Sequence, residues 1–288
     1  MRLIAYREDG RASLGIRLGE EVVPLGAVTP GLPADPVAAI AALHLPAAAP
    51  DLARRAAACG TRRPLAGLQL LPPVPRPGKI VCIGLNYALH AKEGNNPIPD
   101  YPAVFMRGAT SLVGPDAAIV RPKASQKLDW EAELVIVIGR RARHLSEADA
   151  LSCVAGYSCM NEGSVRDYQR KSTQWTIGKN FDSSGSFGPE IVTPDEIPQG
   201  PNKLRISLRV NGETMQDSNT DDMIFSVPKI IATLSEAMTL EPGDVIATGT
   251  PSGVGYPRTP PRFMTPGDVV EVEIEGIGIL RNTIVDEA

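Results

Sequence analysis

Cysteine is scarce in this chain of 288 residues: only four are present, and no two of them form a C-x-x-C pair. This excludes the disulfide framework of a small secreted domain, and we expect free, buried thiols in a reducing compartment. Long apolar runs are also lacking, because the longest strongly apolar segment is Leu134–Ile138, whereas about 20 residues are needed to cross a bilayer. The first six residues meet Arg7, Glu8 and Asp9 at once, which leaves no apolar core for a signal peptide. We therefore expect a cytoplasmic protein.

An excess of positive charge is absent as well. The 29 lysines and arginines face 33 aspartates and glutamates, which gives a formal net charge of −4 at pH 7. This balance provides no electrostatic reason to expect nucleic acid or an anionic membrane as a partner. Glycine and proline, in contrast, are abundant at 27 each, which favours short strands and tight turns over long helices.

The chain divides into two parts at a proline-rich segment. Residues 72–78 contain four prolines and a glycine, a composition typical of a stiff linker. We predict a small N-terminal α+β domain at residues 1–73 and a larger catalytic domain at residues 74–288. The N-terminal part has patterns typical of three strands and one helix, at Met1–Arg7, Ala12–Leu18, Glu21–Leu25 and Leu52–Cys59.

The second part predicts a strand-rich α+β fold. Its candidate strands are Lys79–Gly84, Glu131–Ile138, Arg205–Val210, Val245–Thr248 and Val269–Ile274. Only two helices are indicated, at Tyr87–Glu93, with Asn86 as its cap and Gly94 as its end, and at Phe225–Met238. The sequence Pro-Gly-Asp-Val occurs at residues 242–245 and again at 266–269, and Pro-Gly suits the middle of a type II turn.

Two carboxylates share one face at the start of a strongly apolar strand. Glu131 and Glu133 are two residues apart, before Leu134–Ile138, and residues i and i+2 of a strand point to the same side. Beside a buried sheet, such a pair must be protonated, paired with cationic side chains or bound to a cation. A hard divalent ion such as Mg²⁺ suits these oxygen ligands. The alternative is a solvated strand end with two ordinary surface acids.

A histidine and a glutamate lie one helical turn apart in the segment before Gly94. His90 and Glu93 can touch across the predicted helix. A glutamate bonded to one imidazole nitrogen orients the ring and raises its basicity, which leaves the other nitrogen free for a proton or a water molecule. The alternative is an ordinary pair on a helix surface. The remaining histidines, His44 and His144, have no nearby acid on the same local face and are interpreted as structural.

Two further segments mix polar residues with glycine. Residues 161–182 combine acids, bases and amides with aromatic residues, and residues 248–255 read Thr-Gly-Thr-Pro-Ser-Gly-Val-Gly after a predicted strand. Glycines let backbone N–H groups approach an anion, although neither a P-loop nor a G-x-G-x-x-G pattern is present. A charged surface loop and a plain glycine loop are the respective alternatives.

Together these segments resemble the fumarylacetoacetate hydrolase superfamily, particularly its short bacterial members. The resemblance covers about residues 74–288 and is most specific in Asn86–Glu93, Asp129–Gly139, Val210–Gly212, Gln216–Pro228 and Leu240–Gly255. It implies a mixed β-roll catalytic domain, usually in a homodimer, and a place in the breakdown of aromatic or organic acids. It also implies a bound Mg²⁺ or Mn²⁺, with Ca²⁺ as a further candidate.

The resemblance implies three metal ligands, three catalytic residues and four substrate-binding residues. The metal ligands are Glu131, Glu133 and Glu162. The catalytic residues are a water-activating dyad on a lid-like segment and a lysine that polarises the substrate oxygen: His90, Glu93 and Lys179. The substrate-binding residues are Arg107, Arg166, Gln169 and Thr250. Two of these positions depart from the family, because Glu162 stands where aspartate is usual and Arg107 where lysine is common.

The activity implied is metal-dependent cleavage of a C–C bond in a small 1,3-diketo or acylpyruvate-type acid. His90, oriented by Glu93, would deprotonate a water molecule that attacks the distal carbonyl, while Lys179 and the metal stabilise the enolate that leaves. A second hypothesis is decarboxylation or enol–keto tautomerisation of a β-keto acid such as oxaloacetate at the same site. A third, from another class, is a non-catalytic, metal-stabilised binding protein.

Overall fold

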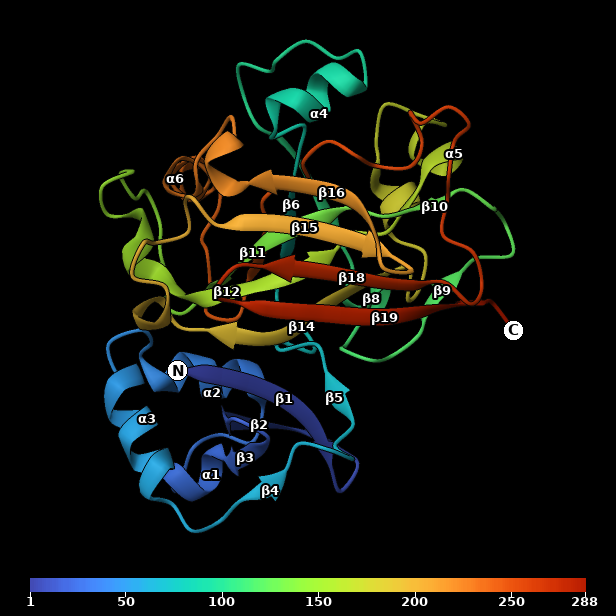
Figure 1. Ribbon diagram of the computed structural model, residues 1–288. Helices are drawn as coiled ribbons and strands as arrows, with labels where there is room; N and C mark the ends of the chain where they lie inside the picture. The colour runs from blue at the N-terminus through green and yellow to red at the C-terminus, as the bar shows by residue number, and fades with distance from the viewer.

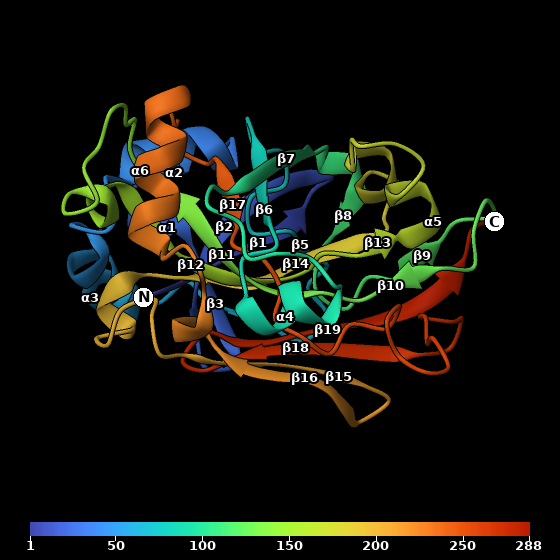
Figure 2. The same cartoon turned by 90° about the horizontal axis from the view of Figure 1, so that it is seen from above.

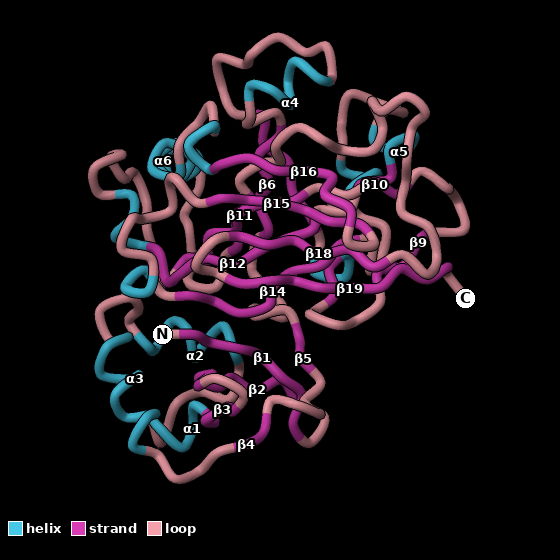
Figure 3. The backbone as a smooth tube through the Cα atoms, viewed as in Figure 1, coloured by secondary structure: helices cyan, strands magenta, loops and turns pink.

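One long sheet runs through both parts of the chain in the computed structural model, which describes residues 1–288 (Figures 1 and 3). Its strands are β1 (Arg2–Glu8), β2 (Arg11–Leu18), β3 (Glu21–Pro24), β4 (Arg63–Pro64), β5 (Leu70–Leu71), β6 (Ile80–Gly84), β7 (Ala103–Arg107), β8 (Leu112–Val113), β11 (Ala132–Ile138), β12 (Val154–Asn161), β14 (Gly185–Val192) and β17 (Val245–Ala247). The main path runs β4-β3-β2-β1-β14-β12-β11-β17-β6-β7, while β5 pairs with β1 and β8 with β14.

A second sheet packs on the larger part of the first. Its strands, in spatial order, are β16 (Glu213–Asn219), β15 (Arg205–Val210), β18 (Val269–Ile274), β19 (Gly278–Asp286) and β9 (Ile119–Arg121). A two-stranded ladder joins β10 (Leu128–Asp129) to β13 (Ser164–Val165). Parallel and antiparallel pairs occur together, since β17 is parallel to β6 and antiparallel to β11. The strand-rich α+β class and the mixed sheet are therefore confirmed.

Helices are short and lie outside the sheets (Figure 2). The α-helices are α1 (Leu25–Val28), α2 (Pro36–Leu43), α3 (Ala49–Ala58), α4 (Ala88–Glu93), α5 (Arg166–Gln169) and α6 (Val227–Ala237). Single 3₁₀ turns are η1 (Ala109–Ser111), η2 (Ala150–Cys153), η3 (Thr176–Lys179), η4 (Pro194–Glu196) and η5 (Thr220–Asp222). No helix has the length and apolar character that a bilayer crossing requires.

The N-terminal part joins the rest of the molecule through its first strand. β1 is antiparallel to β14, with Arg2 opposite Val192. The N-terminal amine is buried and donates to the Thr193 hydroxyl at 2.7 Å, and Leu3 lies in the same hydrophobic cluster as Val135 of β11. The sheet therefore continues across the predicted boundary between residues 73 and 74, and the division into two domains there stays a proposal.

Strand β11 is apolar along its whole length because both of its faces are covered. Leu134, Ile136 and Ile138 belong to one large hydrophobic cluster, and Val135 and Val137 belong to the other. A strand buried on both faces reads as a continuous apolar run rather than as an alternation. The rigid strand positions the two acids at its start.

Most predicted elements are present, with one error in detail at the start of α4. The cap residue of α4 is Tyr87, and no side chain caps this helix. The predicted cap, Asn86, is instead fully buried: its amide donates to the carbonyls of Phe225 and Thr248 and its oxygen accepts from the Phe225 N–H. Long-range partners have thus taken the group that a local cap would use, and they tie the base of α4 to the start of α6. The four cysteines are free and, apart from the half-buried Cys59, are buried.

Candidate active site

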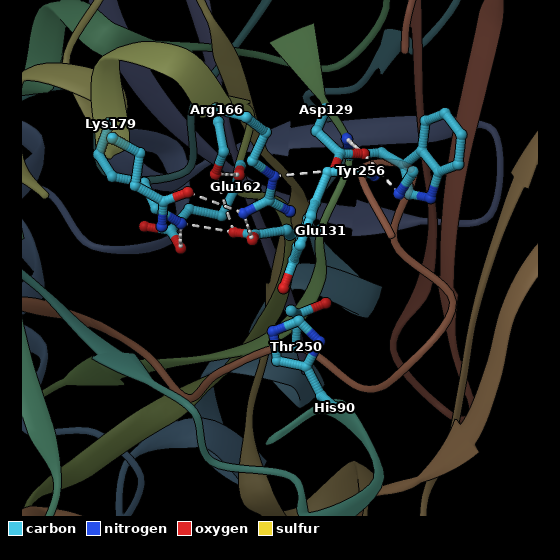
Figure 4. Close-up of polar contacts among 12 residues, drawn as sticks. His90, Asp129, Glu131, Glu162, Arg166, Lys179, Thr250 and Tyr256 are labelled. Atoms are coloured by element: carbon cyan, nitrogen blue, oxygen red, sulfur yellow. Dashed lines mark hydrogen bonds and ion pairs between the residues drawn. The ribbon is translucent and has the colours of Figure 1, made fainter. Parts of the chain in front are cut away.

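A polar cavity of about 370 Å³ opens at the start of β11. Eight of the ten predicted site residues line it: His90, Glu131, Glu133, Glu162, Arg166, Gln169, Lys179 and Thr250. They come from α4, β11, the end of β12, α5, η3 and the loop after β17, segments that are far apart in the sequence. Figure 4 shows two of the acids, Glu131 and Glu162, the two cations Arg166 and Lys179, and His90 directed toward the same space.

Three buried glutamates converge in this cavity. Each offers a carboxylate oxygen, and the three oxygens lie within 4.8 Å of one another. Glu131 and Glu133 share a face at the start of β11, as their spacing predicts. Glu162 follows β12, and the pairing of Ala132 with Asn161 brings it beside Glu131, whose carbonyl accepts from the Glu162 N–H at 2.8 Å.

Two buried cations hold part of this negative charge. The Lys179 ammonium lies 2.5 Å from Glu131 Oε2 and 2.7 Å from Glu162 Oε2, and Arg166 Nη1 lies 2.7 Å from Glu131 Oε1. Burial opposes ionisation of Glu131, but Arg166 and Lys179 outweigh it and keep the pKa of this carboxyl below its usual range. Burial likewise opposes the charge on Lys179, and Glu131 and Glu162 overcome it to raise the pKa of the ammonium.

Glu133 is the acid without a cationic partner in the cluster. Burial, followed by repulsion from Glu162 and Glu131, raises the pKa of its carboxyl well above the usual range. Its Oε2 accepts one hydrogen bond, from the Gly249 N–H at 2.9 Å. Burial and the neighbouring carboxylates thus oppose the charged form of Glu133 while only the protein's own cations are present.

The cluster fits a hard divalent cation. Oxygen donors from carboxylates are the ligands that Mg²⁺ and Mn²⁺ take in proteins. Glu133 lines the cavity, makes no ion pair and accepts one hydrogen bond, from the Gly249 N–H, so its carboxylate has unused capacity facing this space. Glu131, Glu133 and Glu162 are the residues that would hold the ion.

His90 and Glu93 form the pair that their spacing predicts. His90 Nδ1 lies 3.3 Å from Glu93 Oε2, and the histidine is only 7% exposed. The Gly253 N–H donates to both oxygens of the Glu93 carboxylate, at 3.0 Å to Oε1 and 3.2 Å to Oε2, and so holds this carboxylate beside the imidazole. With Nδ1 occupied by Glu93, Nε2 is the nitrogen of His90 available to a substrate or a water molecule.

The glycine-rich loop at residues 248–255 binds anions, but these are the protein's own carboxylates. Gly249 holds Glu133, Gly253 holds Glu93, and Gly255 donates to Asp129 Oδ1 at 2.8 Å. These close contacts explain the glycines, because a Cβ at Gly255 would meet the Arg262 carbonyl oxygen at 1.9 Å. The loop therefore orients the acidic side chains of the site.

Hydrogen bonds to other side chains hold three predicted polar residues of the cavity in place: Arg166, Gln169 and Thr250. Arg166 Nε donates to Asp129 Oδ2 at 2.8 Å, and its Nη1 donates to Gln169 Oε1 at 3.0 Å. The Thr250 hydroxyl accepts from Gln216 Nε2 at 2.8 Å, which leaves its own proton free to donate into the cavity.

Arg107 lies outside the cavity, although the family resemblance implies substrate contact there. Its side chain is fully buried behind Glu162, 3.7 Å from Glu162 Oε1. Its nitrogens donate to the Ser111 hydroxyl, the Gly163 carbonyl and the Ser184 hydroxyl. With its donors facing protein groups, Arg107 supports Glu162 from behind, and we do not assign it to substrate.

Sequence reasoning missed several residues of the site. Asp129 stands in the segment that carries the metal acids, but its role of orienting Arg166 depends on the fold. Arg170, Trp175 and Tyr256 also line the cavity, and Trp175 packs edge-on against Phe105 at 5.6 Å between ring centroids. Their only sequence signal is their position, because Arg170 and Trp175 lie within the polar segment at residues 161–182 and Tyr256 directly follows residues 248–255.

Comparison with known proteins places this geometry in context. A family model described as the C-terminal region of fumarylacetoacetate (FAA) hydrolase matches residues 79–285. A curated relative, the mitochondrial oxaloacetate tautomerase FAHD2A of Bos taurus, is 42% identical over 294 residues, which covers 99% of this chain and 92% of the relative.

Solved structures agree with the fold over the full length. A putative HpcE protein from Mycobacterium smegmatis superimposes with a TM-score of 0.87 at 36% identity, covering 100% of both chains. Maleylpyruvate hydrolase from Sphingobium sp. SYK-6, solved in complex with manganese(II) and pyruvate, superimposes with a TM-score of 0.82 at 30% identity, again covering 100% of both chains.

Proposed function

The chain belongs to the fumarylacetoacetate hydrolase family, and on that premise we propose that it is a divalent-metal-dependent enzyme acting on a small 2-oxo acid. The observation that carries this proposal is the convergence of Glu131, Glu133 and Glu162 beside the His90–Glu93 pair in one polar cavity. The reaction we place first is keto–enol tautomerisation of oxaloacetate. Its support is the whole-length similarity to the bovine oxaloacetate tautomerase.

The side chains of the cavity suit proton transfer at carbon. A divalent cation held by the three glutamates would polarise the 2-oxo group and make the adjacent C–H more acidic. His90 Nε2 takes the proton from this carbon, and Glu93 stabilises the imidazolium that forms. The proton then passes to the oxygen of the enolate, which gives the enol, and the same steps in reverse restore the ketone. Lys179 supplies a positive charge beside the developing oxyanion.

C–C hydrolysis of an acylpyruvate-type acid is the second candidate. The specific observation in its favour is the fixed His90–Glu93 pair, which could also remove a proton from a water molecule. The attacking water would form a bond to the distal carbonyl carbon, and the C–C bond would break to leave a carboxylic acid and the enolate of a 2-oxo acid. The similarity to maleylpyruvate hydrolase adds support.

Activity and thermal stability should both respond to the metal. Purified protein with Mg²⁺ is expected to speed the loss of oxaloacetate enol absorbance, or the loss of acetylpyruvate absorbance, and EDTA should stop it. Mg²⁺ at about 100 times its dissociation constant should add roughly 2.7 kcal/mol to the free energy of unfolding, measured as a rise in melting temperature. Folding itself should not need the ion, because the two large hydrophobic clusters are independent of it.

Two results would contradict this function. Turnover unaffected by EDTA would remove the metal from the reaction, and a metal-free protein without a folded circular-dichroism signal would show that the ion is structural. Comparing Mg²⁺, Mn²⁺ and Ca²⁺ in the same assays tests our choice of Mg²⁺ as the ion. A cytoplasmic location is also part of the proposal, although the bovine relative is named as mitochondrial.

We further propose that the chain acts as a homodimer. β7 is the last strand of the long sheet, and its Val104 and Met106 are each more than 40% exposed on one face. Ile98 and Tyr101, just before β7, are more than 60% exposed. An apolar, unpaired edge is suited to contact with a second copy across a two-fold axis. Light scattering should give twice the mass of the chain, and Met106→Lys should shift it toward the monomer; a monomeric wild type would contradict the proposal.

A further inference from the structure

Arg170 is a cation of the cavity that no acid of the chain neutralises. Three lysine and arginine side chains line this space, and two of them, Arg166 and Lys179, are ion-paired to buried carboxylates. Arg170 directly follows α5, is exposed, and makes neither an ion pair nor a side-chain hydrogen bond within the chain. All of its donors are therefore available to a ligand.

An aromatic ring holds Arg170 beside a second unused donor. The Arg170 guanidinium lies over the Tyr256 ring, with its Cζ 4.3 Å from the ring centroid, and the Arg166 Cζ lies 4.7 Å from the same centroid. Arg166 is 4% exposed, and its Nη2 is buried without a hydrogen-bond partner. Stacking on an aromatic face restricts the guanidinium without consuming its N–H groups. Two guanidiniums with unused donors thus lie against one ring in the cavity.

This arrangement is suited to a planar anion. Guanidinium groups bind carboxylates through paired N–H donors, and such charge-assisted hydrogen bonds are stronger than neutral ones. Arg166 also contacts Glu131, so its unused nitrogen lies close to the proposed metal cluster. Arg170 and Tyr256 line the same cavity, so they are available to the other end of a ligand whose 2-oxo carboxylate occupies the cluster.

We propose that Arg170, together with Nη2 of Arg166, binds a second carboxylate of the substrate, so that the enzyme selects 2-oxo dicarboxylates over 2-oxo monocarboxylates. The inference rests on the proposed function, in that one end of the substrate occupies the acidic cluster. The class includes oxaloacetate and acylpyruvates that carry a distal carboxylate. A monocarboxylate would form no ion pair with Arg170 and would leave the buried Nη2 of Arg166 unmatched. An unpaired buried donor is a strong source of discrimination.

The test compares two unreactive ligands that differ only at the distal end. Malate and 2-hydroxybutanoate share the 2-hydroxy carboxylate, but malate carries a carboxylate where 2-hydroxybutanoate carries a methyl group. Their association constants are measured calorimetrically with Mg²⁺ present. Wild type should prefer malate, and Arg170→Gln should reduce the ratio of the two constants by about 10- to 100-fold, the range for a lost charged hydrogen bond. Arg170→Lys should retain part of the ratio.

A neighbouring residue supplies the matched control. Lys171 is exposed, lies over the Tyr168 ring and does not line the cavity. Lys171→Gln removes the same charge one residue away, so it should leave the ratio within about twofold of wild type, since a solvated surface charge contributes little. If Arg170→Gln and Lys171→Gln lowered the ratio of association constants equally, the effect would come from the general electrostatic field of the protein. That result would overturn the proposal.

The remaining outcomes separate this inference from the proposed function. An unchanged ratio in Arg170→Gln, or binding of neither ligand by wild type, overturns the role of Arg170. In one outcome, Arg170→Gln lowers the ratio of the malate and 2-hydroxybutanoate association constants, but the protein turns over neither oxaloacetate nor an acylpyruvate. This result supports the carboxylate site and rejects the proposed reaction. In the other outcome, the protein turns over one of these substrates, but Arg170→Gln leaves the ratio of association constants unchanged. This result supports the reaction and rejects this carboxylate site.

Discussion

Glu133→Gln should abolish the stabilisation by Mg²⁺ while leaving the metal-free protein about as stable as wild type. Burial and the neighbouring glutamates oppose the charged form of Glu133 and raise its pKa, so an uncharged glutamine at this position should cost the metal-free protein little. Glutamine has nearly the same shape, and its oxygen can still accept from the Gly249 N–H. The metal loses one of three anionic ligands, so the rise in melting temperature should disappear and turnover should fall by about 100-fold or more, beyond the range for supporting residues of metal sites.

The control for this prediction is a buried acid far from the cavity. Glu190 is 1% exposed and its Oε1 lies 2.6 Å from Arg2 Nη1. Glu190→Gln should lower the melting temperature with and without Mg²⁺ by similar amounts, because it weakens that ion pair and leaves the metal cluster intact. If Mg²⁺ raised the melting temperature of Glu133→Gln as much as that of wild type, Glu133 would not be a ligand of the metal.

His90→Ala should reduce turnover by about 10²- to 10⁴-fold, the usual contribution of a positioned general base. The only nitrogen that can reach a substrate in this pair is Nε2, since Nδ1 contacts Glu93. The shift in melting temperature with Mg²⁺ should persist, because His90 is not among the three clustered acids. Measuring oxaloacetate tautomerisation and acylpyruvate hydrolysis in the same variant shows which of the two reactions depends on this base.

His144→Asn is the matched control for the histidine. His144 is exposed, lies far from the cavity and has a φ of 54°, a conformation that asparagine tolerates. The activity of the His144→Asn protein should equal that of wild type. Turnover by His90→Ala within about threefold of wild type would exclude His90 as the base, given the contribution expected of one. If Mg²⁺ no longer raised the melting temperature of His90→Ala, the imidazole would instead be a ligand of the metal.

The sequence alone was sufficient wherever the relevant geometry is local. The two-residue repeat of a strand placed Glu131 and Glu133 on one face, and the turn of a helix placed His90 beside Glu93. The apolar run of β11 indicated a strand covered on both sides, and Pro242-Gly243 indicated a type II turn, where Gly243 has a φ of 82°. These features depend on backbone periods that neighbouring residues determine.

Features that depend on pairing between distant segments were decided only by the tertiary structure. The role of the glycine loop is one example, because Gly253 reaches Glu93 across 160 positions and the loop's N–H groups serve carboxylates that no local pattern connects to it. Arg107 is another: the side chains of β7 alternate, so Val104 and Met106 face outward while Arg107 faces inward to Ser184 and Glu162. The family resemblance marks Arg107 as a candidate ligand for substrate, but strand register and burial determine what a side chain can touch. The same reason explains why the exposed Arg170 became significant only when the fold placed Tyr256 beneath it.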